Sequence, residues 1–471
     1  LQNMLEGPLE KKTGRLYGPP GTQKMIFFVD DLNMPMLDQY NTQSAIALVR
    51  QHLDYGHWFD KEKWQLKDIQ NCQYAACLNP TAGSFVINPR LQRHMTVFAI
   101  GFPSQSSLTV IYNTFLEGKF KTFDHSIQSL APSLIKATLS LHSQVVQSFR
   151  KTAINFHYEF SIRHLAAVFQ GLLNVMPEQF SGTGADSSTE KMTRLWVHEC
   201  ERVYADRLVT VDDFQRYRKL VLGVVGKQLK QFTKNLSKFF AKDNAAPLVY
   251  CHFAGGLQQQ RYDEAESIHS LKQTLELGLR EYNDVNAAMD LVLFEDAIKH
   301  VAKIVRIIMN PSGHALLVGV GGSGKQSLSR LASFCCGYNV SQIVISATYG
   351  INELKEDLRA MYRRSGLKQE GTTFLFTDSQ ITNERFLVYF NDLLSSGNIP
   401  DLFPPEEKEE ILNSLRTPCK QAGRGESNES VYSFFLDRVR ANLHVILCFS
   451  CQGQQTCPSC GPFWLWQDAT G

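Results

Sequence analysis

A glycine-rich segment in the second half of the sequence has the residue types and spacing of a phosphate-binding loop. Residues 319–327 read Gly-Val-Gly-Gly-Ser-Gly-Lys-Gln-Ser, directly after the apolar run 315–318 and before the helical pattern 328–334. Glycines let the backbone curl until successive N–H groups point inward, and the next helix presents its positive N-terminus. Lys325 adds a charge for the β- and γ-phosphates, so we predict an ATP or ADP site. The residues expected to contact the nucleotide are Gly319, Gly321, Gly322, Ser323, Gly324, Lys325, Gln326 and Ser327.

The metal side of this site departs from the usual pattern at one position. Gln326 follows Lys325, where a serine or threonine hydroxyl normally binds Mg²⁺. Either Ser327 or the amide oxygen of Gln326 substitutes for that hydroxyl, or the site binds Mg²⁺ more weakly. Asp378 ends the apolar run 374–377 and is the predicted carboxylate ligand, because Mg²⁺ prefers oxygen donors.

The side of the site that would activate water lacks a second carboxylate. Ser379 follows Asp378, and the later apolar run 445–449 ends in Ser450. A hydroxyl is a poor base near neutral pH compared with a carboxylate. We therefore expect this site to hold nucleotide more than to cleave it.

A second group of polar residues follows two apolar runs in the first hundred residues. Asp30 and Asp31 end the run 26–29, and Asn79 ends the run 74–78. One carboxylate would serve the Mg²⁺ shell and the next the attacking water, and the neutral amide of Asn79 would orient that water or touch the γ-phosphate. On the pattern alone, two strand-end acids that face solvent are the alternative.

Three arginines complete this group. Arg90 and Arg93, within residues 88–94, are candidate arginine fingers for the nucleotide of a neighbouring subunit. Arg163, in the helical pattern 161–171, is a candidate contact to the phosphates of its own module. A single arginine is more often a surface or ion-pair residue. The ordered set of acids, amide and arginines is what supports these roles.

Residues 18–24, Gly-Pro-Pro-Gly-Thr-Gln-Lys, look like another phosphate loop, and we reject them as one. Gln23 replaces the glycine before the lysine, and Met25 replaces the serine or threonine after it. A strand pattern follows, where a helix should present its amides. We predict a tight turn that feeds a strand.

These residues must be positioned by two α/β regions with a helical region between them. Short apolar runs that end in polar residues predict buried parallel strands; they cover residues 26–29, 74–78, 95–100, 315–318, 342–345, 374–377 and 445–450. Helical periods cover residues 43–53, 133–152, 162–175 and 211–240. Strands that alternate with helices imply an α/β fold with doubly wound parallel sheets.

The two α/β regions repeat one theme in the same order, namely an apolar strand ending in Asp, a helix, a glycine-containing loop and a strand ending in a small polar residue. A tandem repeat of one module, cut at both ends, explains this order. The expected divisions are the later part of a first α/β subdomain, a helical subdomain with its connection, a second α/β subdomain with the phosphate loop, and a tail; these cover residues 1–103, 104–285, 286–450 and 451–471.

Composition limits the function classes. The chain has 471 residues, and its 48 Lys and Arg nearly balance 46 Asp and Glu, which leaves no broad positive surface for nucleic acid or anionic membrane. We expect neither partner, and no apolar run approaches the roughly 20 residues of a membrane span. Eleven cysteines, several within apolar runs, fit a reducing compartment. We expect a soluble, unsecreted protein.

With these residues assembled, the sequence resembles the dynein heavy-chain motor, specifically the third and fourth AAA+ modules of its ring, over residues 14–450. Asp-Asp-Leu-Asn-Met-Pro at 30–35 and the Asp378–Ser379 pair look axonemal more than cytoplasmic. The segments that carry the resemblance are 28–35, 79–85, 88–94, 291–297, 319–327 and 391–397.

The resemblance implies P-loop AAA+ modules with an all-helical lid, in an ATP-driven, minus-end-directed microtubule motor of cilia and flagella. This segment would bind ATP or ADP with Mg²⁺ in a regulatory module and, alone, would be a very weak ATPase. The implied partners are the neighbouring AAA+ modules of the same heavy chain, the intermediate and light chains, and microtubules through a stalk that lies outside this segment. The implied locations are cytoplasm, cytoskeleton and ciliary axoneme.

Two other functions stay open at this point. One is a nucleotide-gated structural module without useful hydrolysis, which Ser379 favours. The other is a midasin-like ATPase, which also has several AAA+ modules in one chain.

The tail after Ser450 does not match the family. Its Cys457 and Cys460, with Cys451, have the spacing of a partial zinc site but lack a second ligand pair.

Overall fold

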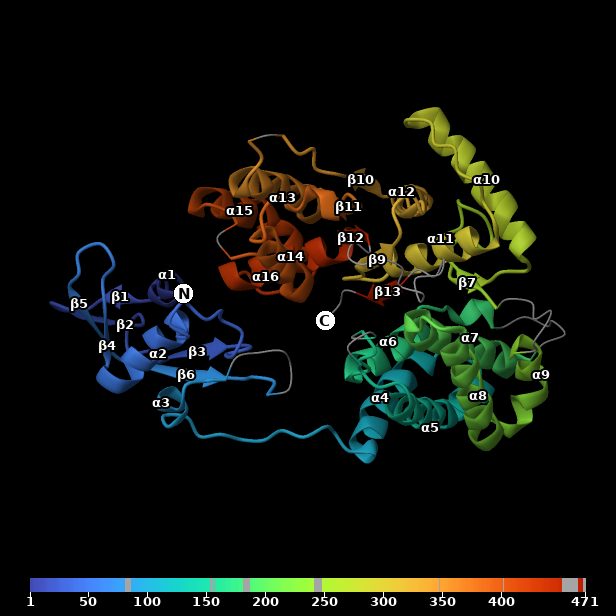
Figure 1. The fold of residues 1–471 in the computed structure, drawn as a ribbon, viewed down its shortest axis with the longest axis horizontal. Coiled ribbons are helices and arrows are strands. Elements are labelled where there is room, and N and C mark those ends of the chain that lie inside the picture. The colour runs from blue at the N-terminus through green and yellow to red at the C-terminus, as the bar shows by residue number, and fades with distance from the viewer. Residues whose placement is uncertain are drawn as a thin grey trace. The chain divides into compact units, whose positions relative to one another are not determined.

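The computed structural model describes residues 1–80, 86–152, 155, 157–180, 187–240, 248–346, 348–400 and 402–450, and the backbone of 465–468. The chain forms two units, Leu1–Phe102 and Pro103–Gly471, and Figure 1 colours it from blue at the N-terminus to red at the C-terminus.

The first unit contains a small sheet whose strands carry the acidic residues. β3 and β6 pair in parallel, with Val29 opposite Ala76, so the polar residues that follow both strands meet at one edge. Helix α2 packs Ile46 and Val49 against Leu32. A second sheet has the order β1-β2-β5-β4. The elements of this unit are α1 Gln2–Glu6, β1 Glu10–Lys11, β2 Leu16–Gly18, β3 Met25–Val29, α2 Ser44–Tyr55, β4 His57–Phe59, β5 Leu66–Ile69, β6 Cys72–Ala76 and α3 Pro89–Gln92.

The strand predicted over residues 95–100 is wrong. Val97, Phe98 and Ile100 are 68%, 79% and 94% exposed, and this segment pairs with no strand in the described part of the unit. An apolar run becomes a strand only when another strand satisfies its backbone N–H and C=O groups. β3 and β6 pair with each other, and neither contributes its other edge to residues 95–100.

The second unit begins with a helical region that has one continuous core. In α5, buried residues recur three and four apart, as in Ile127, Leu130, Leu134 and Thr138, and this face packs on α7 around Trp196. A short hairpin, β7–β8, follows. The elements are α4 Gln105–Phe120, α5 His125–Ser148, α6 Ile162–Leu173, α7 Ser188–Tyr204, α8 Val211–Gln228, α9 Thr233–Ser237, β7 Tyr250–Cys251, β8 Asp263–Glu264 and α10 Ile268–Val285.

Two predicted helices differ in extent from the observed ones. The helix predicted over 211–240 ends at Gln228, and short turns then lead into α9, because the chain turns to bury Leu229 and Phe232 in the core. The helix predicted over 133–152 begins earlier, at His125, and continues through Pro132. Tertiary burial outweighed the local signals in both places.

The remainder of the second unit is a sheet with helices on both faces, the doubly wound α/β class that the sequence predicts. The order is β10-β11-β12-β9-β13, and the first four strands are parallel. β13 pairs antiparallel with β9. The elements are α11 Glu295–Ile308, β9 Ala315–Gly319, α12 Lys325–Cys335, β10 Asn339–Ser341, α13 Ile351–Gly366, β11 Thr372–Thr377, α14 Phe386–Ser396, α15 Pro405–Gln421, α16 Asn428–Asn442, β12 Leu443–Ser450 and β13 Leu465–Asp468.

Alternation along β11 shows how the sheet is covered. Leu375 packs in the cluster that contains residues of α11 and α12, whereas Phe374 and Phe376 pack in the cluster that contains residues of α13, α14 and α16. Successive side chains of a strand point to opposite faces, so both faces of this strand are buried.

The strand predicted over 342–345 is misplaced. β10 ends at Ser341, and the carbonyl of Ile343 accepts a hydrogen bond from the side-chain amide of Gln380 in place of a strand partner.

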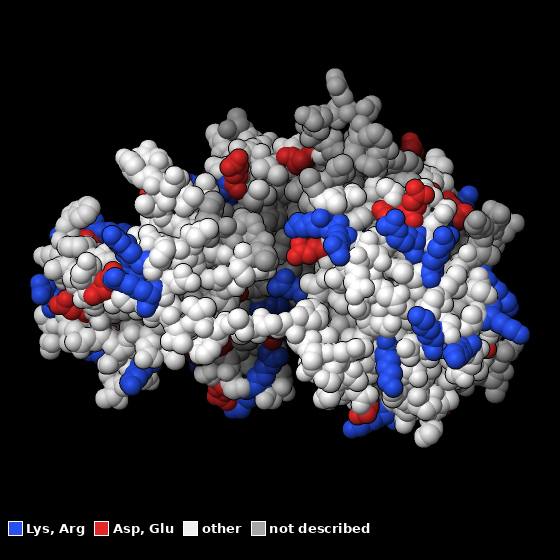
Figure 2. Space-filling model, turned by 60° about the horizontal axis from the view of Figure 1, so that its bottom comes forward, with Lys and Arg blue, Asp and Glu red and all other residues white. Residues whose placement is uncertain are grey.

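Charges of both signs are spread over the face of the molecule in Figure 2, with uncharged surface between them. Among the helices described above, none combines the length and apolarity that a membrane crossing needs.

Candidate nucleotide-binding site

The segment between β9 and α12 has the backbone geometry that the phosphate loop requires. Gly322 and Gly324 have φ of +76° and +78°, a region that side chains rarely adopt, and a Cβ at either residue would meet no atom within 4 Å. Backbone conformation, and not space, is therefore what requires glycine here. Gly324 is the N-cap of α12, so the loop runs into the helix N-terminus.

Lys325 is folded into this loop. Its Nζ donates hydrogen bonds to the carbonyls of Gly319 at 2.8 Å and Val320 at 2.7 Å, and to the hydroxyl of Ser323 at 3.1 Å. The lysine is 7% exposed. Its ammonium group thus lies within the curl of the loop, where a phosphate would offer oxygens in place of these carbonyls.

Asp378 lies beside the loop at the carboxyl edge of the sheet. Its Oδ2 accepts a hydrogen bond from the N–H of Ser450 at 2.9 Å, and its Oδ1 accepts one from the N–H of Ser379 at 2.9 Å. Ser450 is the register partner of Gly319 in the neighbouring strand. The strand ends therefore bring Asp378, Ser450 and the start of the loop together, as predicted for parallel strands.

The ionisation of Asp378 follows from these contacts. Partial burial works to raise the pKa of its carboxyl, but the hydrogen bonds from Ser450 and Ser379 and the charge of Lys325 outweigh burial and lower the pKa below its ordinary value. An ionised carboxylate beside an anion cradle fits a hard cation such as Mg²⁺, which is usually held by one or two carboxylates together with the phosphates.

The start of α12 separates the candidates for the remaining metal ligand. Lys325 and Ser329, four residues apart, are buried on one face of the helix, and Gln326 is exposed beside them. Ser327 lies about 200° around the helix from Lys325, at about 100° per residue. No contact of the Ser327 side chain places it at Asp378.

Among the described residues, no group of three or more His, Cys, Asp or Glu side chains is arranged to hold a metal ion. The three cysteines of the tail lie outside the described residues.

In the first unit, Asp30 and Asp31 follow β3 at the edge that β6 shares. Asp30 Oδ1 accepts hydrogen bonds from the N–H of Asp31 at 3.0 Å and from the thiol of Cys77 at 2.7 Å. The hydrogen bond to Asp30 raises the pKa of the Cys77 thiol, so the thiol remains a donor. Asn33 donates its side-chain N–H to the carbonyl of Asn79 at 3.0 Å. The polar ends of the two strands are thus in contact, as expected from their order.

The rejected segment 18–24 is a turn between strands. β2 ends at Gly18, β3 begins at Met25, and Gly21 has φ of +60°. The helix that would follow a phosphate loop is replaced by a strand, which agrees with the sequence prediction.

The predicted arginines have different surroundings. Arg93 follows α3, and its guanidinium donates from Nη2 to Asp54 Oδ1 at 2.7 Å. Arg90 lies on the same helix and is exposed. Arg163 is the exposed second residue of α6, in the second unit. The role of each arginine at a phosphate stays a prediction.

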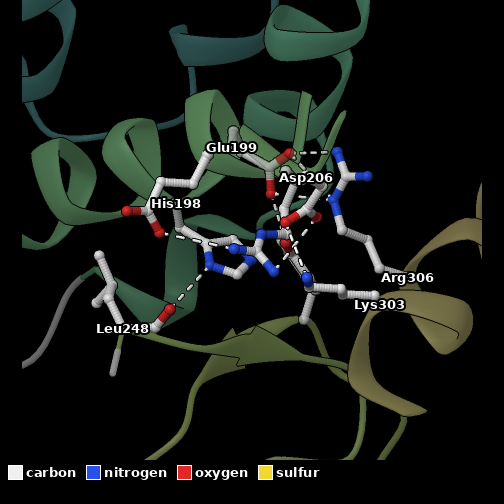
Figure 3. Close-up of polar contacts among 9 residues, drawn as sticks. His198, Glu199, Asp206, Leu248, Lys303 and Arg306 are labelled. Carbon is white, nitrogen blue, oxygen red and sulfur yellow. Dashed lines mark hydrogen bonds and ion pairs between the residues drawn. The ribbon is translucent and has the colours of Figure 1, made fainter. Parts of the chain in front are cut away.

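A buried polar cluster that the sequence does not reveal joins α7 to α11, the helix that precedes β9. Figure 3 shows Arg306 pointing toward Glu199 and Lys303 toward Asp206. Arg306 Nε lies 3.2 Å from Glu199 Oε2, and Lys303 Nζ lies 2.9 Å from Asp206 Oδ1. A Cβ on Gly171 would lie 1.7 Å from Glu199 Oε2, so this carboxylate needs a glycine beside it.

Comparison with known proteins identifies similar sequences along most of the chain. Residues 1–103 match the family described as P-loop containing dynein motor region, residues 134–238 match the AAA+ lid domain, and residues 289–461 match the P-loop containing dynein motor region D4.

Individual relatives agree with these matches. The dynein alpha chain of the flagellar outer arm of Chlamydomonas reinhardtii is 55% identical over 455 residues, which are 96% of this chain and 10% of the relative. The ciliary dynein beta chain of Tripneustes gratilla and dynein axonemal heavy chain 17 of Homo sapiens are 48% and 47% identical over 452 residues, again 96% of this chain and 10% of each relative. The chain spans a tenth of the length of these relatives.

Proposed function

The chain belongs to the axonemal dynein heavy chains, and from that premise we propose that it forms the third and fourth AAA+ modules of the motor ring, with a regulatory nucleotide site at Lys325. The observation that carries the site is the loop itself, in which two positive-φ glycines, a buried lysine and a helix N-terminus follow one another directly. ATP and ADP are the ligands that such a cradle fits.

Mg²⁺ at this site would neutralise charge that develops on the β- and γ-phosphate oxygens. Asp378 is the carboxylate that would hold it, because its hydrogen bonds and the nearby Lys325 keep it ionised. Two residues could replace the serine or threonine hydroxyl that normally binds Mg²⁺. Gln326 directly follows Lys325 on α12, as that hydroxyl would, whereas Ser327 supplies a hydroxyl one position later. Gln326 is exposed and Ser327 is half-buried.

Slow hydrolysis is the second part of the proposal. Ser379 occupies the position next to Asp378 where a carboxylate would activate water, and Ser450 ends the adjacent strand. A general base is typically worth about 10² to 10⁴ in rate. The site in this chain would therefore hold ATP without rapid cleavage, which suits regulation.

The first unit would contribute the residues that bind Mg²⁺ and position water at the nucleotide site of the third module. We assign Asp30 and Asp31 to Mg²⁺ and water, Asn79 to water orientation, and Arg163 to the phosphates of the same module. Arg90 and Arg93 are assigned as fingers toward the nucleotide of the module before. On this assignment, residues 1–103 are the later part of the third module's α/β subdomain, 104–285 its lid and connection, and 286–450 the α/β subdomain of the fourth.

The wider activity follows from family membership. In the intact heavy chain, these modules would take part in ATP-driven, minus-end-directed movement along microtubules in the axoneme of cilia and flagella. Neighbouring modules, intermediate and light chains and, through a stalk, microtubules are the partners. A nucleotide-gated structural module is the second candidate, favoured by Ser379. Dynein relatives along 96% of the chain set aside a midasin-like ATPase.

A titration of the chain with a fluorescent ADP analogue tests the nucleotide site. Lys325→Ala should weaken binding at least tenfold, since the lysine is the positive side chain of the cradle. Lys368→Ala, at an exposed lysine beyond α13, is the matched control and should bind as the wild type does. If the wild type and Lys325→Ala bind the analogue with equal affinity, the nucleotide does not bind at this loop.

A further inference from the structure

One stretch of the helical region carries positive charge alone. Residues 214–240, which run from α8 through α9, contain seven Lys and Arg and no Asp or Glu. The chain as a whole is nearly balanced, with 48 Lys and Arg against 46 Asp and Glu, so its overall composition does not report this local excess. All seven basic residues are exposed, and we call them the basic strip: Arg216, Arg218, Lys219, Lys227, Lys230, Lys234 and Lys238.

The packing of this stretch leaves the basic strip on the solvent side. The residues that face the core recur mostly at intervals of three or four; they are Tyr217, Val221, Val224, Val225, Leu229, Phe232, Leu236 and Phe240. In the turns after α8, Lys230, Lys234 and Lys238 recur every fourth residue between the buried ones. Lys234 lies about 200° around α9 from Leu236, at about 100° per residue. The apolar side therefore holds the stretch on the core, and the lysines project from the opposite side.

Few acidic side chains neutralise the basic strip. Among the described residues, its one ion pair joins Arg216 Nη1 to Asp213 Oδ1 at 3.9 Å. Asp213 lies in the first turn of α8, where the helix N-terminus favours an acid. Helix α5, which packs against α8, has no Asp or Glu and adds the exposed Lys136. Figure 2 brings the lower side of Figure 1 forward, and over the helical region at its right it shows Lys and Arg side chains separated by uncharged surface.

This arrangement differs from a mixed surface, on which charges of opposite sign lie together. On α11, for example, Lys299 Nζ lies 2.6 Å from Glu295 Oε1. The basic strip has almost no such partners, so its charges add to a positive potential that attracts a negatively charged partner. Exposed charges are screened beyond about 8 Å at physiological ionic strength, so the attraction acts at short range.

The other residues of the stretch distinguish between classes of partner. Single-stranded nucleic acid stacks its bases on exposed aromatic side chains, whereas Tyr217, Phe232 and Phe240 are buried. Binding in a membrane surface uses exposed large apolar side chains, and residues 214–240 present none. An acidic peptide needs only the charges, because carboxylates accept hydrogen bonds from lysine and arginine. The stretch therefore fits an acidic peptide best.

We propose that the basic strip binds an acidic segment of a partner protein, rich in Glu or Asp and extended along α8 and the turns that follow it. From Arg216 to Lys227, α8 is about 16 Å long, at about 1.5 Å per residue. An extended peptide covers that length with about five residues, at about 3.3 Å each. A segment of about ten residues is thus long enough to contact both α8 and the lysines after it.

The test measures the fluorescence anisotropy of fluorescein-labelled decaglutamate as the chain is added, at low and at physiological salt. The wild type should bind the peptide, and physiological salt should weaken the binding because the charges are exposed. A triple variant that combines Lys227→Gln, Lys230→Gln and Lys234→Gln should bind at least fivefold more weakly. All three lysines are exposed, so the circular dichroism spectrum and the affinity for the ADP analogue should stay those of the wild type.

The matched control combines Lys368→Gln, Lys408→Gln and Lys420→Gln, which removes the same charge from exposed lysines outside the basic strip. It should bind decaglutamate within twofold of the wild type. If the wild type does not bind decaglutamate, or if both triple variants lose the same affinity, the proposal is wrong. Tighter binding of labelled decauridylate or of phosphatidylserine vesicles, lost in the strip variant, would also overturn it and would assign the surface to nucleic acid or to membrane.

Discussion

The carboxylate of Asp378 accepts a hydrogen bond from the backbone N–H of Ser450 at 2.9 Å, and this contact joins the carboxyl ends of β11 and β12. The same hydrogen bond helps to keep the aspartate ionised against the opposing effect of partial burial. The carboxylate that we propose as the Mg²⁺ ligand is thus ionised without a metal. Ser379, and not a second carboxylate, follows it in the sequence, so the proposed site would bind Mg²⁺ and lack a base.

Asp378→Asn should separate metal-dependent from metal-independent binding. We expect it to weaken the affinity for Mg²⁺–ATP about tenfold and to leave the affinity for ADP in excess EDTA nearly unchanged, because an amide keeps the shape but loses the charge. Because the pKa of Asp378 is below its ordinary value, the carboxylate stays ionised between pH 6 and 8. The difference between the wild-type affinities with and without Mg²⁺ should therefore be constant over this range. Calorimetric titration checks this, with Asp437→Asn on α16 as control. Equal losses with and without Mg²⁺ would contradict the assignment.

Ser379→Glu should raise the rate of ATP hydrolysis by the chain. The new carboxylate would stand where the base is absent, and a general base contributes about 10² to 10⁴ in rate. Ser379→Gln has the same length without a base and should stay at the wild-type rate. Phosphate release measured over hours distinguishes the two. An equal rate for Glu and Gln would show that something other than the base limits this site.

Glu199→Gln should destabilise the second unit much more than a surface pair does. Glu199 is fully buried and bonded to Arg306, and removing one member of a buried ion pair typically costs about 3–5 kcal/mol. Glu178→Gln removes an exposed partner of Arg261 and should cost about 0–1 kcal/mol. Urea unfolding followed by tryptophan fluorescence compares the two. Similar midpoints would mean that the cluster in Figure 3 does not hold α7 to α11.

Acid should destabilise the second unit through His314. Burial lowers its pKa to about 3 from an ordinary 6.5, and its Nδ1 accepts the N–H of Val445, so the folded state keeps the ring neutral. The unfolded chain binds a proton below pH 6.5, and stability therefore falls as the pH drops from 6.5 toward 3, by up to about 1.4 kcal/mol per unit.

His314→Gln should reduce this slope, whereas His269→Gln, at an exposed histidine, should not. Other buried or half-buried histidines of the same unit will keep most of the dependence, so the slope should fall and not vanish. They include His444, 6.3 Å from His314 between ring centroids and with a lowered pKa, and His142, His164, His252 and His300, whose pKa values are lowered to about 3 or 4. Urea midpoints at several pH values give the slopes. A slope unaffected by His314→Gln would rule out this residue as the source.

The sequence predicts the geometry of the loop at Lys325 because all its parts are local or lie at strand ends. The loop needs glycines, a lysine and a helix start in one short segment, and Asp378 is placed by the register of parallel strands. Arg306 and Glu199 are 107 residues apart, so no local pattern reports that they pair. Asp54 and Arg93 likewise meet only because α2 packs beside α3. The run 95–100 has the pattern of a strand but lacks a pairing partner, which no local pattern reports.

The central claim, that the loop at Lys325 holds ATP without rapid turnover, is tested most directly by the chemical state of bound nucleotide. The chain is mixed with radiolabelled ATP, separated from free nucleotide, quenched at intervals and assayed for ATP and ADP. We expect about one nucleotide per chain, mostly ATP after many minutes, and none retained by Lys325→Ala. Conversion to ADP at motor-like rates, on the order of 1 to 10² per second, or retention by Lys325→Ala would contradict the account.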